Sequence, residues 1–288
     1  MPHKNNAFVL LRGGGDLATG VALRLQRTGI KLIITELPQP LAVRRTVAFS
    51  EAVYEGHHTV EGVTARCVEL YQALSILDMN EIPILIDPDA KILTSDLGSL
   101  TCLVVVDARL MKSPPDPLPV DIPLHIGLGP GFHAGKDCHA VVETRRSHTL
   151  GRVYWNGTTQ PDSGEPEGDR RRVLRAPGDG ILIAHAKIGD HLEEGQVIAV
   201  VSERYPVNSP FKGVLRGLIR PGLFVTKGLK IGDVDPRDDP SACYLVSDKA
   251  LSIGGGVLEA ILSREEIRSK LWTPTPPRPS TGRPPNTI

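Results

Sequence analysis

Short apolar runs alternate with amphipathic stretches in the first half of the chain. Residues 8–11 form a β-rich apolar run that meets three glycines at 13–15. Apolar positions then recur at helical spacing over 17–25, and Gly29 stands where a helix C-terminal cap is expected. A second apolar run follows at 31–35. The order strand, glycine turn, helix, strand predicts the opening of a doubly wound parallel sheet.

The same alternation continues to about residue 128. Apolar runs at 82–86 and 103–106 indicate strands covered on both faces, because continuous β-branched runs suit buried parallel strands. We therefore expect an α/β fold with a Rossmann-like parallel sheet over residues 1–156. A polar stretch rich in Gly, Pro, Asp and Glu, residues 157–172, indicates a linker.

An internal repeat follows the linker. Residues 176–182 (APGDGIL) match 209–215 (SPFKGVL) at an offset of 33 residues, and Gly189 matches Gly222 at the same offset. A fixed offset with glycines in register predicts two copies of one β-unit that bury their apolar faces against each other.

The repeat resembles the biotinyl/lipoyl barrel-sandwich fold, which we expect over residues 173–240. Such domains carry a modifiable lysine on the hairpin between the two halves, and here that hairpin falls within 201–208 (VSERYPVN), which has no lysine. We therefore expect no biotin or lipoate, and a structural or docking role. Residues 241–272 predict a strand and a helix that return to the first domain, and the Pro-rich tail at 273–288 predicts disorder.

Charge and cysteine usage narrow the class of protein. The 33 basic residues balance the 33 acidic ones, so the global basic field of a nucleic-acid-binding protein is absent. No apolar run reaches the roughly 18 residues of a membrane span, and the first residues lack the pattern of a signal peptide. The four cysteines form no CxxC pair, which disfavours a disulfide framework or a structural zinc site. We expect a cytoplasmic protein.

The glycine turn is the first candidate binding site. Gly13, Gly14, Gly15 and Asp16 lie in a G-x-G-x-x-A pattern, whose glycines let backbone N–H groups approach a diphosphate at a helix N-terminus. Glu36 ends the second predicted strand, where an acid accepts hydrogen bonds from a ribose. The alternative is a scaffold whose glycines only pack the helix on the strand. Asp16 departs from the pattern; it would repel a phosphate, or hold a metal or a substrate amine.

A second candidate follows the most buried predicted strand. Asp107 and Arg109 come directly after that strand, at the sheet edge where doubly wound folds bind ligands. A guanidinium in this position pairs with a phosphate or carboxylate. The equally weighted alternative is an internal ion pair between Asp107 and Arg109.

Histidines gather in the third candidate region. His133, Cys138 and His139 are potential metal ligands or proton-transfer groups, and a cysteine beside a histidine raises the idea of a reactive thiolate. Their spacing matches no zinc signature, so we predict no metal site and favour ordinary loop histidines. The roles of these three residues stay open.

Five motifs resemble a bacterial family of accessory proteins for selenium-dependent molybdenum hydroxylases. They are RGGGDLATG (12–20), VVVDARLMK (104–112), GLGPGFHAGKDCHAVVETRRSHTLGRV (127–153), KIGDVDPR (230–237) and SIGGGVLEAIL (252–262). The family is distantly similar to xanthine dehydrogenase accessory proteins, which share a Rossmann domain. The resemblance implies pocket residues in the glycine turn and in the GPGF loop, with Gly129 and Gly131, and it implies no catalytic residue.

The resemblance implies an accessory protein in the maturation of molybdenum-cofactor-dependent hydroxylases. It would bind a nucleotide or a molybdopterin-type cofactor and dock on the apo-hydroxylase. One alternative is an NAD(P)-dependent oxidoreductase with Lys112, His133 or His139 as proton donor, and another is a nucleotide-sensing scaffold without catalysis. The candidate cofactors are thus a molybdopterin-type cofactor and NAD(P). Whether the chain forms a homo-oligomer stays open.

Overall fold

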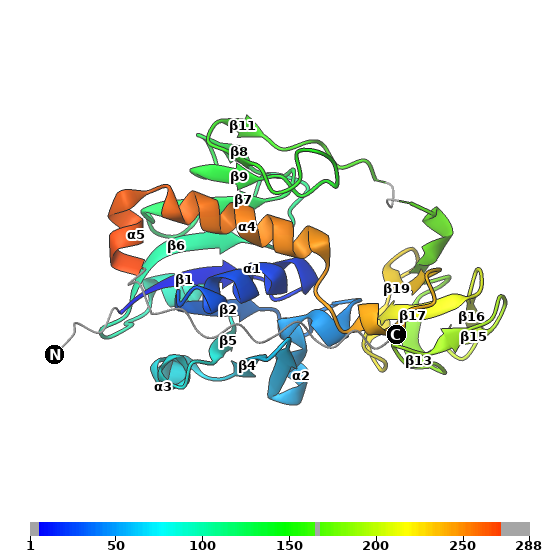
Figure 1. Cartoon of the computed structure of the whole chain (residues 1–288). Coiled ribbons are helices and arrows are strands. Elements are labelled where there is room, and N and C mark those ends of the chain that lie inside the picture. Colours follow the sequence, from blue (N-terminus) through cyan, green and yellow to red (C-terminus); the bar gives the residue numbers. More distant parts are fainter. Residues whose placement is uncertain (1–5, 165–167, 272–288) are drawn as a thin grey trace.

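A nine-stranded sheet forms the centre of the protein, whose computed structural model describes residues 6–164 and 168–271 (Figure 1). In spatial order its strands are β10 (Val153–Tyr154), β9 (Ala140–Val142), β7 (Leu124–Leu128), β6 (Thr101–Asp107), β1 (Ala7–Arg12), β2 (Leu32–Glu36), β5 (Ile82–Ile86), β4 (Val63–Cys67) and β3 (His57–Val60). Neighbours from β9 through β4 run parallel, whereas β3 with β4 and β9 with β10 pair antiparallel.

Helices cover both faces of this sheet. They are α1 (Asp16–Arg27), α2 (Ala52–Glu55), α3 (Ala73–Asp78), α4 (Asp248–Leu262) and α5 (Glu265–Leu271). The alternation of side chains along β1 divides the core. Val9 and Leu11 face the core layer that contains residues of α1, α4 and α5, and Phe8 and Leu10 face the layer that contains Leu77 of α3. These four side chains of β1 are fully buried, as expected for a strand covered on both faces.

The closest helix packing joins α1 to α4, which lie side by side (Figure 1). A methyl group added at Gly20 would lie 2.5 Å from the backbone of Ala250, and one added at Gly254 would lie 2.6 Å from the carbonyl oxygen of Gly20. These positions accept only glycine because the two backbones nearly touch there. The N-terminal ends of α1 and α4 are thereby held next to each other.

Two four-stranded antiparallel sheets make up the C-terminal region. One contains β12 (Val173–Arg175), β19 (Lys230–Asp235), β17 (Gly213–Leu218) and β14 (His191–Leu192). The other contains β16 (Tyr205–Asn208), β15 (Val197–Val201), β13 (Gly180–Ala184) and β18 (Phe224–Val225). The predicted duplication is confirmed, since the strands of one sheet match those of the other in the same order at the offset of about 33 residues.

The predicted fold class needs correction. The sequence predicts a Rossmann-like parallel sheet and a barrel-sandwich β-domain; the structure is a mixed α/β fold with one large mixed sheet and separate antiparallel sheets, including the small pair β8 (His133–Ala134) and β11 (Gly157–Thr158). The β3–β4 hairpin accounts for one antiparallel edge. Its two-residue turn at Glu61 and Gly62 has positive φ at both positions, which reverses the chain directly.

The C-terminal region packs directly on the first part of the chain. Gly217 of β17 lies against Val43, so that a methyl group added there would come within 2.8 Å of the valine side chain. Arg45 donates a hydrogen bond from Nε to the Leu218 carbonyl oxygen at 2.7 Å. The predicted tail at 273–288 lies outside the described residues. Within the described ranges, no helix combines the length and the apolar composition needed to cross a membrane.

Replacing Gly20 by alanine tests the close approach of α1 and α4. We expect Gly20→Ala to destabilise the protein by about 1–3 kcal/mol, because the methyl group forces the helices apart. The matched control is Gly255→Ala, also helical, where an added methyl group meets no atom within 4 Å. That change should stabilise the protein by about 0.5–1 kcal/mol. Urea unfolding measures both, and equal midpoints for Gly20→Ala and the wild type would contradict the packing argument.

Candidate anion-binding cavity

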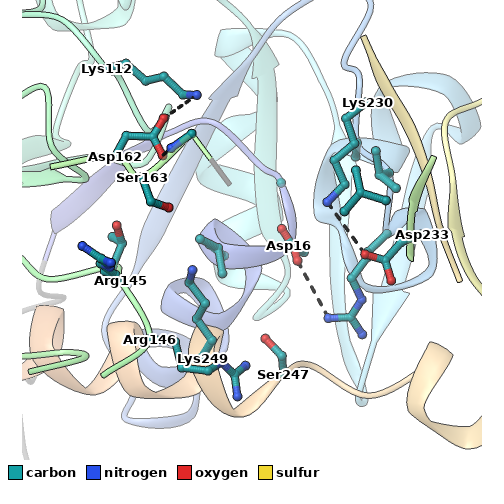
Figure 2. A pocket seen from close by; sticks show the side chains of 18 of the residues that line it. Asp16, Lys112, Arg145, Arg146, Asp162, Ser163, Lys230, Asp233, Ser247 and Lys249 are labelled. Atoms are coloured by element: carbon teal, nitrogen blue, oxygen red, sulfur yellow. Dashed lines mark hydrogen bonds and ion pairs between the residues drawn. The ribbon is translucent and has the colours of Figure 1, made fainter. Parts of the chain in front are cut away.

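A cavity of about 560 Å³ opens beside the first turns of α1 and α4 (Figure 2). Its walls come from the start of α1, the loop before residue 45, the loops at 144–146 and 160–164, strands β12, β17 and β19, and the start of α4. Parts of the chain that are distant in the sequence therefore meet at one place. This volume lies in the range of ordinary small-molecule sites.

Positive charge dominates the lining. The first half of the chain contributes Arg44, Lys112, Arg145 and Arg146. The C-terminal part contributes Arg172, Arg175, Arg216, Lys230 and Lys249. Against these nine cations stand three carboxylates, those of Asp16, Asp162 and Asp233. Because the whole chain has a formal net charge of zero, this excess is a property of the cavity and not of the composition.

Two helix N-termini add to the positive potential. Gly15, Asp16 and Leu17, at the start of α1, line the cavity, and so do Ser247 and Lys249 at the start of α4. The helices have 12 and 15 residues, long enough for a full macrodipole at each end. The partial positive charge of both helices thus reaches the same space, which favours an anion there.

A buried carboxylate organises the wall made by the C-terminal sheet. Asp233 of β19 has a side chain only 2% exposed and accepts hydrogen bonds from Arg172 at 2.9 Å and Arg216 at 2.8 Å. Lys230 lies 3.9 Å from the same carboxylate. Arg216 also pairs with the Asp235 carboxylate at 3.2 Å, so two buried carboxylates hold the three cations at the cavity wall. Arg216 also has a buried Nε with no hydrogen-bond partner among the described residues.

Arg44 lies near the same wall and is held by backbone carbonyl oxygens. Its Nη2 donates to the carbonyl oxygens of Ala242 at 3.1 Å and Leu245 at 2.9 Å. The side chain is 11% exposed, and this burial lowers the pKa of Arg44. Asp16, with Oδ2 at 3.8 Å from Nη1, opposes that shift.

Glu143 fixes the two loops that close the cavity. This residue follows β9, is 1% exposed, and accepts the backbone N–H of Arg145 at 2.8 Å and that of Gln160 at 2.8 Å. One carboxylate therefore ties the 144–146 loop to the 160–164 loop. Lys112 adds an ion pair to Asp162 of the second loop at 2.6 Å.

The structure places only part of the predicted glycine turn at the cavity. Gly15 and Asp16 line the cavity. Gly13, with φ of +93°, and Gly14 shape the turn behind it. Glu36 is not among the residues that line the cavity, and its oxygens accept the backbone N–H groups of Gly14 at 2.6 Å and Leu37 at 2.7 Å. Burial raises the pKa of Glu36.

The second candidate forms an internal ion pair. Asp107 is fully buried and accepts hydrogen bonds from Arg109 Nη2 at 2.6 Å and Nε at 2.9 Å, while Arg12 Nη1 lies at 3.4 Å. These residues do not line the cavity.

The GPGF loop touches the cavity through Pro130 alone. Gly131 instead packs so closely on the 111–113 segment that an added methyl group would lie 2.5 Å from the Met111 carbonyl oxygen.

The histidine-rich region is held by local hydrogen bonds. Burial raises the pKa of Cys138 to about 12, so its thiol is not activated. His139 accepts the backbone N–H of His125 at Nδ1, at 2.9 Å, and burial lowers the pKa of His125 to about 4. His133 Nδ1 lies 2.9 Å from the Ala134 carbonyl oxygen. Across residues 6–164 and 168–271, no group of three potential metal ligands comes together.

Most of the cationic residues of the cavity were not predicted from the sequence. Arg44, Arg172, Arg216 and Lys230 belong to separate segments, and only the tertiary structure brings them together. One local signal was present. Arg145 and Arg146 come three and four residues after the end of β9, beyond the carboxyl end of a parallel strand, where ligands commonly bind.

Comparisons with known proteins give one close sequence relative. No family model matches the chain. The chain is 46% identical over 260 residues to the uncharacterized protein YqeB of Escherichia coli K12, an alignment that covers 88% of this chain and 47% of that protein. The chain thus spans about half the length of the curated relative it matches.

The solved structures that match are distant. They include the ectoine utilization protein EutE (DoeB) of Ruegeria pomeroyi, at 11% identity with 78% of this chain and 56% of that one covered, and a TM-score of 0.22. An aspartoacylase family protein of Mesorhizobium loti matches at 14% identity, with 79% and 84% covered and a TM-score of 0.26. Likeness at this level carries neither fold nor chemistry to this chain.

These comparisons contradict the family expected from the sequence. The bacterial relative is uncharacterized, and the matching structures are named as an ectoine utilization protein, an aspartoacylase family protein and succinylglutamate desuccinylases, not as accessory proteins of molybdenum hydroxylases. The expected role in hydroxylase maturation, with an apo-hydroxylase as partner, is therefore withdrawn. The alternatives of an NAD(P)-dependent oxidoreductase and of a nucleotide-sensing scaffold find no support either.

Removing the Glu143 carboxylate tests how the cavity loops are held. We expect Glu143→Ala to cost about 1–3 kcal/mol of stability, because two backbone donors lose their acceptor. Hydrogen exchange should accelerate at the amides of Arg145 and Gln160. The control is Glu55→Ala, an exposed acid outside the cavity, which should leave both amides protected. Unchanged protection of the two amides in Glu143→Ala would show that the loops are held by something else.

Proposed function

We propose that this protein binds a small phosphate-bearing anion in the cavity between α1, α4 and the C-terminal sheet. The observation that carries the proposal is the charge of the lining, nine cations against three carboxylates in a chain of zero net charge. Two helix N-termini reach the same space. Separate like charges gathered at one cavity cost free energy unless an anion compensates them, and this cost supports a binding site.

Phosphate fits this lining better than a single carboxylate. Several of the nine cations have partners other than the carboxylates of the lining: Arg44 and Arg175 donate to backbone carbonyl oxygens, and Arg146 pairs with Asp248. Guanidinium groups bind phosphate oxygens in a bidentate manner, and helix N-termini bind phosphate through backbone N–H groups. A group with two charges and several acceptor oxygens uses more of these donors than a carboxylate does.

The two cofactor candidates from the sequence stay predictions. A molybdopterin-type cofactor and NAD(P) both carry phosphate, and the cavity volume of about 560 Å³ is of the size that such ligands partly fill. They belong among the test ligands. A cytoplasmic location also stays a prediction, to which the four free cysteines conform.

Calorimetric titration with inorganic diphosphate tests the proposal directly. We expect saturable binding that weakens as salt is raised from 0.05 to 0.5 M, on the order of a several-fold loss, because solvent ions screen the exposed cations. Arg145→Ala should weaken binding about fivefold, in keeping with the loss of one partly exposed charge. Parallel titrations with NADP and NAD then measure whether a nucleoside adds affinity.

The matched control is Arg204→Ala. Arg204 lies in the β15–β16 turn, away from the cavity, so this change removes the same formal charge without touching the lining. Its affinity for diphosphate should stay within a factor of about two of the wild type. Equal losses in the two variants would mean that overall charge, and not the cavity, attracts the anion, and would refute the proposal.

A further inference from the structure

Two of the three carboxylates in the cavity are already neutralised by the protein. Asp233 accepts hydrogen bonds from two arginines, at 2.8 and 2.9 Å. Asp162 lies 2.6 Å from the Lys112 ammonium and accepts the backbone N–H of Gly164 at 3.2 Å. Both carboxylates therefore serve to hold the walls, and their hydrogen-bonding capacity is largely used.

Asp16 is the exception among these carboxylates. Its nearest ion-pair partner in the described residues is Arg44, at 3.8 Å, which exceeds hydrogen-bond distance. The side chain is 36% exposed and borders the cavity. Its oxygens accept no hydrogen bond from any described side chain or cap. Asp16 thus presents open acceptor positions to the cavity.

Arg44 does not need Asp16 to stay in place. Its guanidinium is fixed by the carbonyl oxygens of Ala242 and Leu245, which belong to the segment before α4. Asp16 is placed independently, as the first residue of α1, where the helix N-terminus favours a negative charge. The weak pair between them is therefore a consequence of two separate restraints, and a ligand group can take the position opposite Asp16 without disturbing the wall.

Asp16 occupies the centre of the cavity in Figure 2. Lys230 and Asp233 lie on one side of it, and Arg145, Arg146 and Lys249 lie on the other. A simple polyanion that spans these cations meets a negative charge midway. A ligand that carries both an anionic and a cationic group meets complementary charge at every point.

We infer that Asp16 selects a zwitterionic ligand, one that carries a phosphate for the cations and an amine for the Asp16 carboxylate. This inference rests on the proposed function, since it names the ligand class of the same cavity. Asp16 is thus a specificity-determining residue: it lowers the affinity for plain anions and raises the affinity for anions that bear an ammonium group. No covalent step is involved.

Two matched probes separate the two charges. Ethyl phosphate and 2-aminoethyl phosphate have the same phosphate and chain length and differ by one ammonium group. Calorimetry on the full chain should show that the wild type binds 2-aminoethyl phosphate about threefold to fivefold more tightly than ethyl phosphate, the range expected for a solvent-accessible ion pair. Asp16→Asn should remove this preference and bind ethyl phosphate more tightly than the wild type does.

Two further variants guard against indirect effects. Asp16→Glu keeps the charge and should keep a preference for the amine. Asp162→Asn removes another carboxylate of the same cavity, one already paired with Lys112, and should strengthen both probes in parallel with their ratio unchanged. Circular dichroism and thermal unfolding confirm that each variant is folded.

The outcomes are distinct. A preference for 2-aminoethyl phosphate that Asp16→Asn abolishes and Asp162→Asn retains would establish the inference. Equal affinity of the wild type for the two probes, or the same ratio in Asp16→Asn, would overturn it while leaving anion binding intact. Failure of both probes and of inorganic diphosphate to bind would refute the proposed function itself.

Discussion

The contact of α1 with α4 is the constraint on which the rest of the structure depends. Gly20 and Gly254 let the two backbones approach to a distance that no side chain permits. Because α1 follows the first strand and α4 comes near the end of the described chain, this contact joins segments more than 200 residues apart. It aligns two helix N-termini beside one cavity. A shift of either helix along the other would separate the charges that the cavity brings together.

The cationic side chains of the cavity must be held in place without being fully neutralised. Two solutions occur in this protein. Asp233 contacts three cations with one carboxylate, and backbone carbonyl oxygens hold Arg44, with the Asp16 carboxylate 3.8 Å away. Carbonyl oxygens and shared carboxylates orient guanidinium groups at a smaller loss of positive potential than one acid per base would cause. The carboxylate of Glu143 follows the same logic, since it binds backbone amides and fixes loops instead of neutralising a base.

The sequence predicted local elements well and their assembly poorly. The apolar run before the glycines, the first helix and the duplicated β-unit are where the pattern placed them, because periodicity and turn glycines act locally. The antiparallel edges of the large sheet were not predicted. The glycine turn was predicted. The Glu36 carboxylate accepts a backbone N–H group of that turn, and spacing alone does not show which way a carboxylate points. Arg44, Arg216 and Lys230 meet only through long-range packing, which no local pattern encodes.

The duplicated β-unit has kept its symmetry in the backbone and lost it in the side chains. Arg216 and Asp233, which face the cavity, correspond at the repeat offset to Ile183 and Val200, which pair with each other on the opposite sheet. The same backbone positions thus carry an ion pair in one copy and an apolar pair in the other. The backbone of the C-terminal region is therefore symmetric, whereas its charge is not. At these positions, only the copy that faces the cavity carries charged side chains. A few side-chain differences thus set the charge of each copy, while the strand order is the same in both.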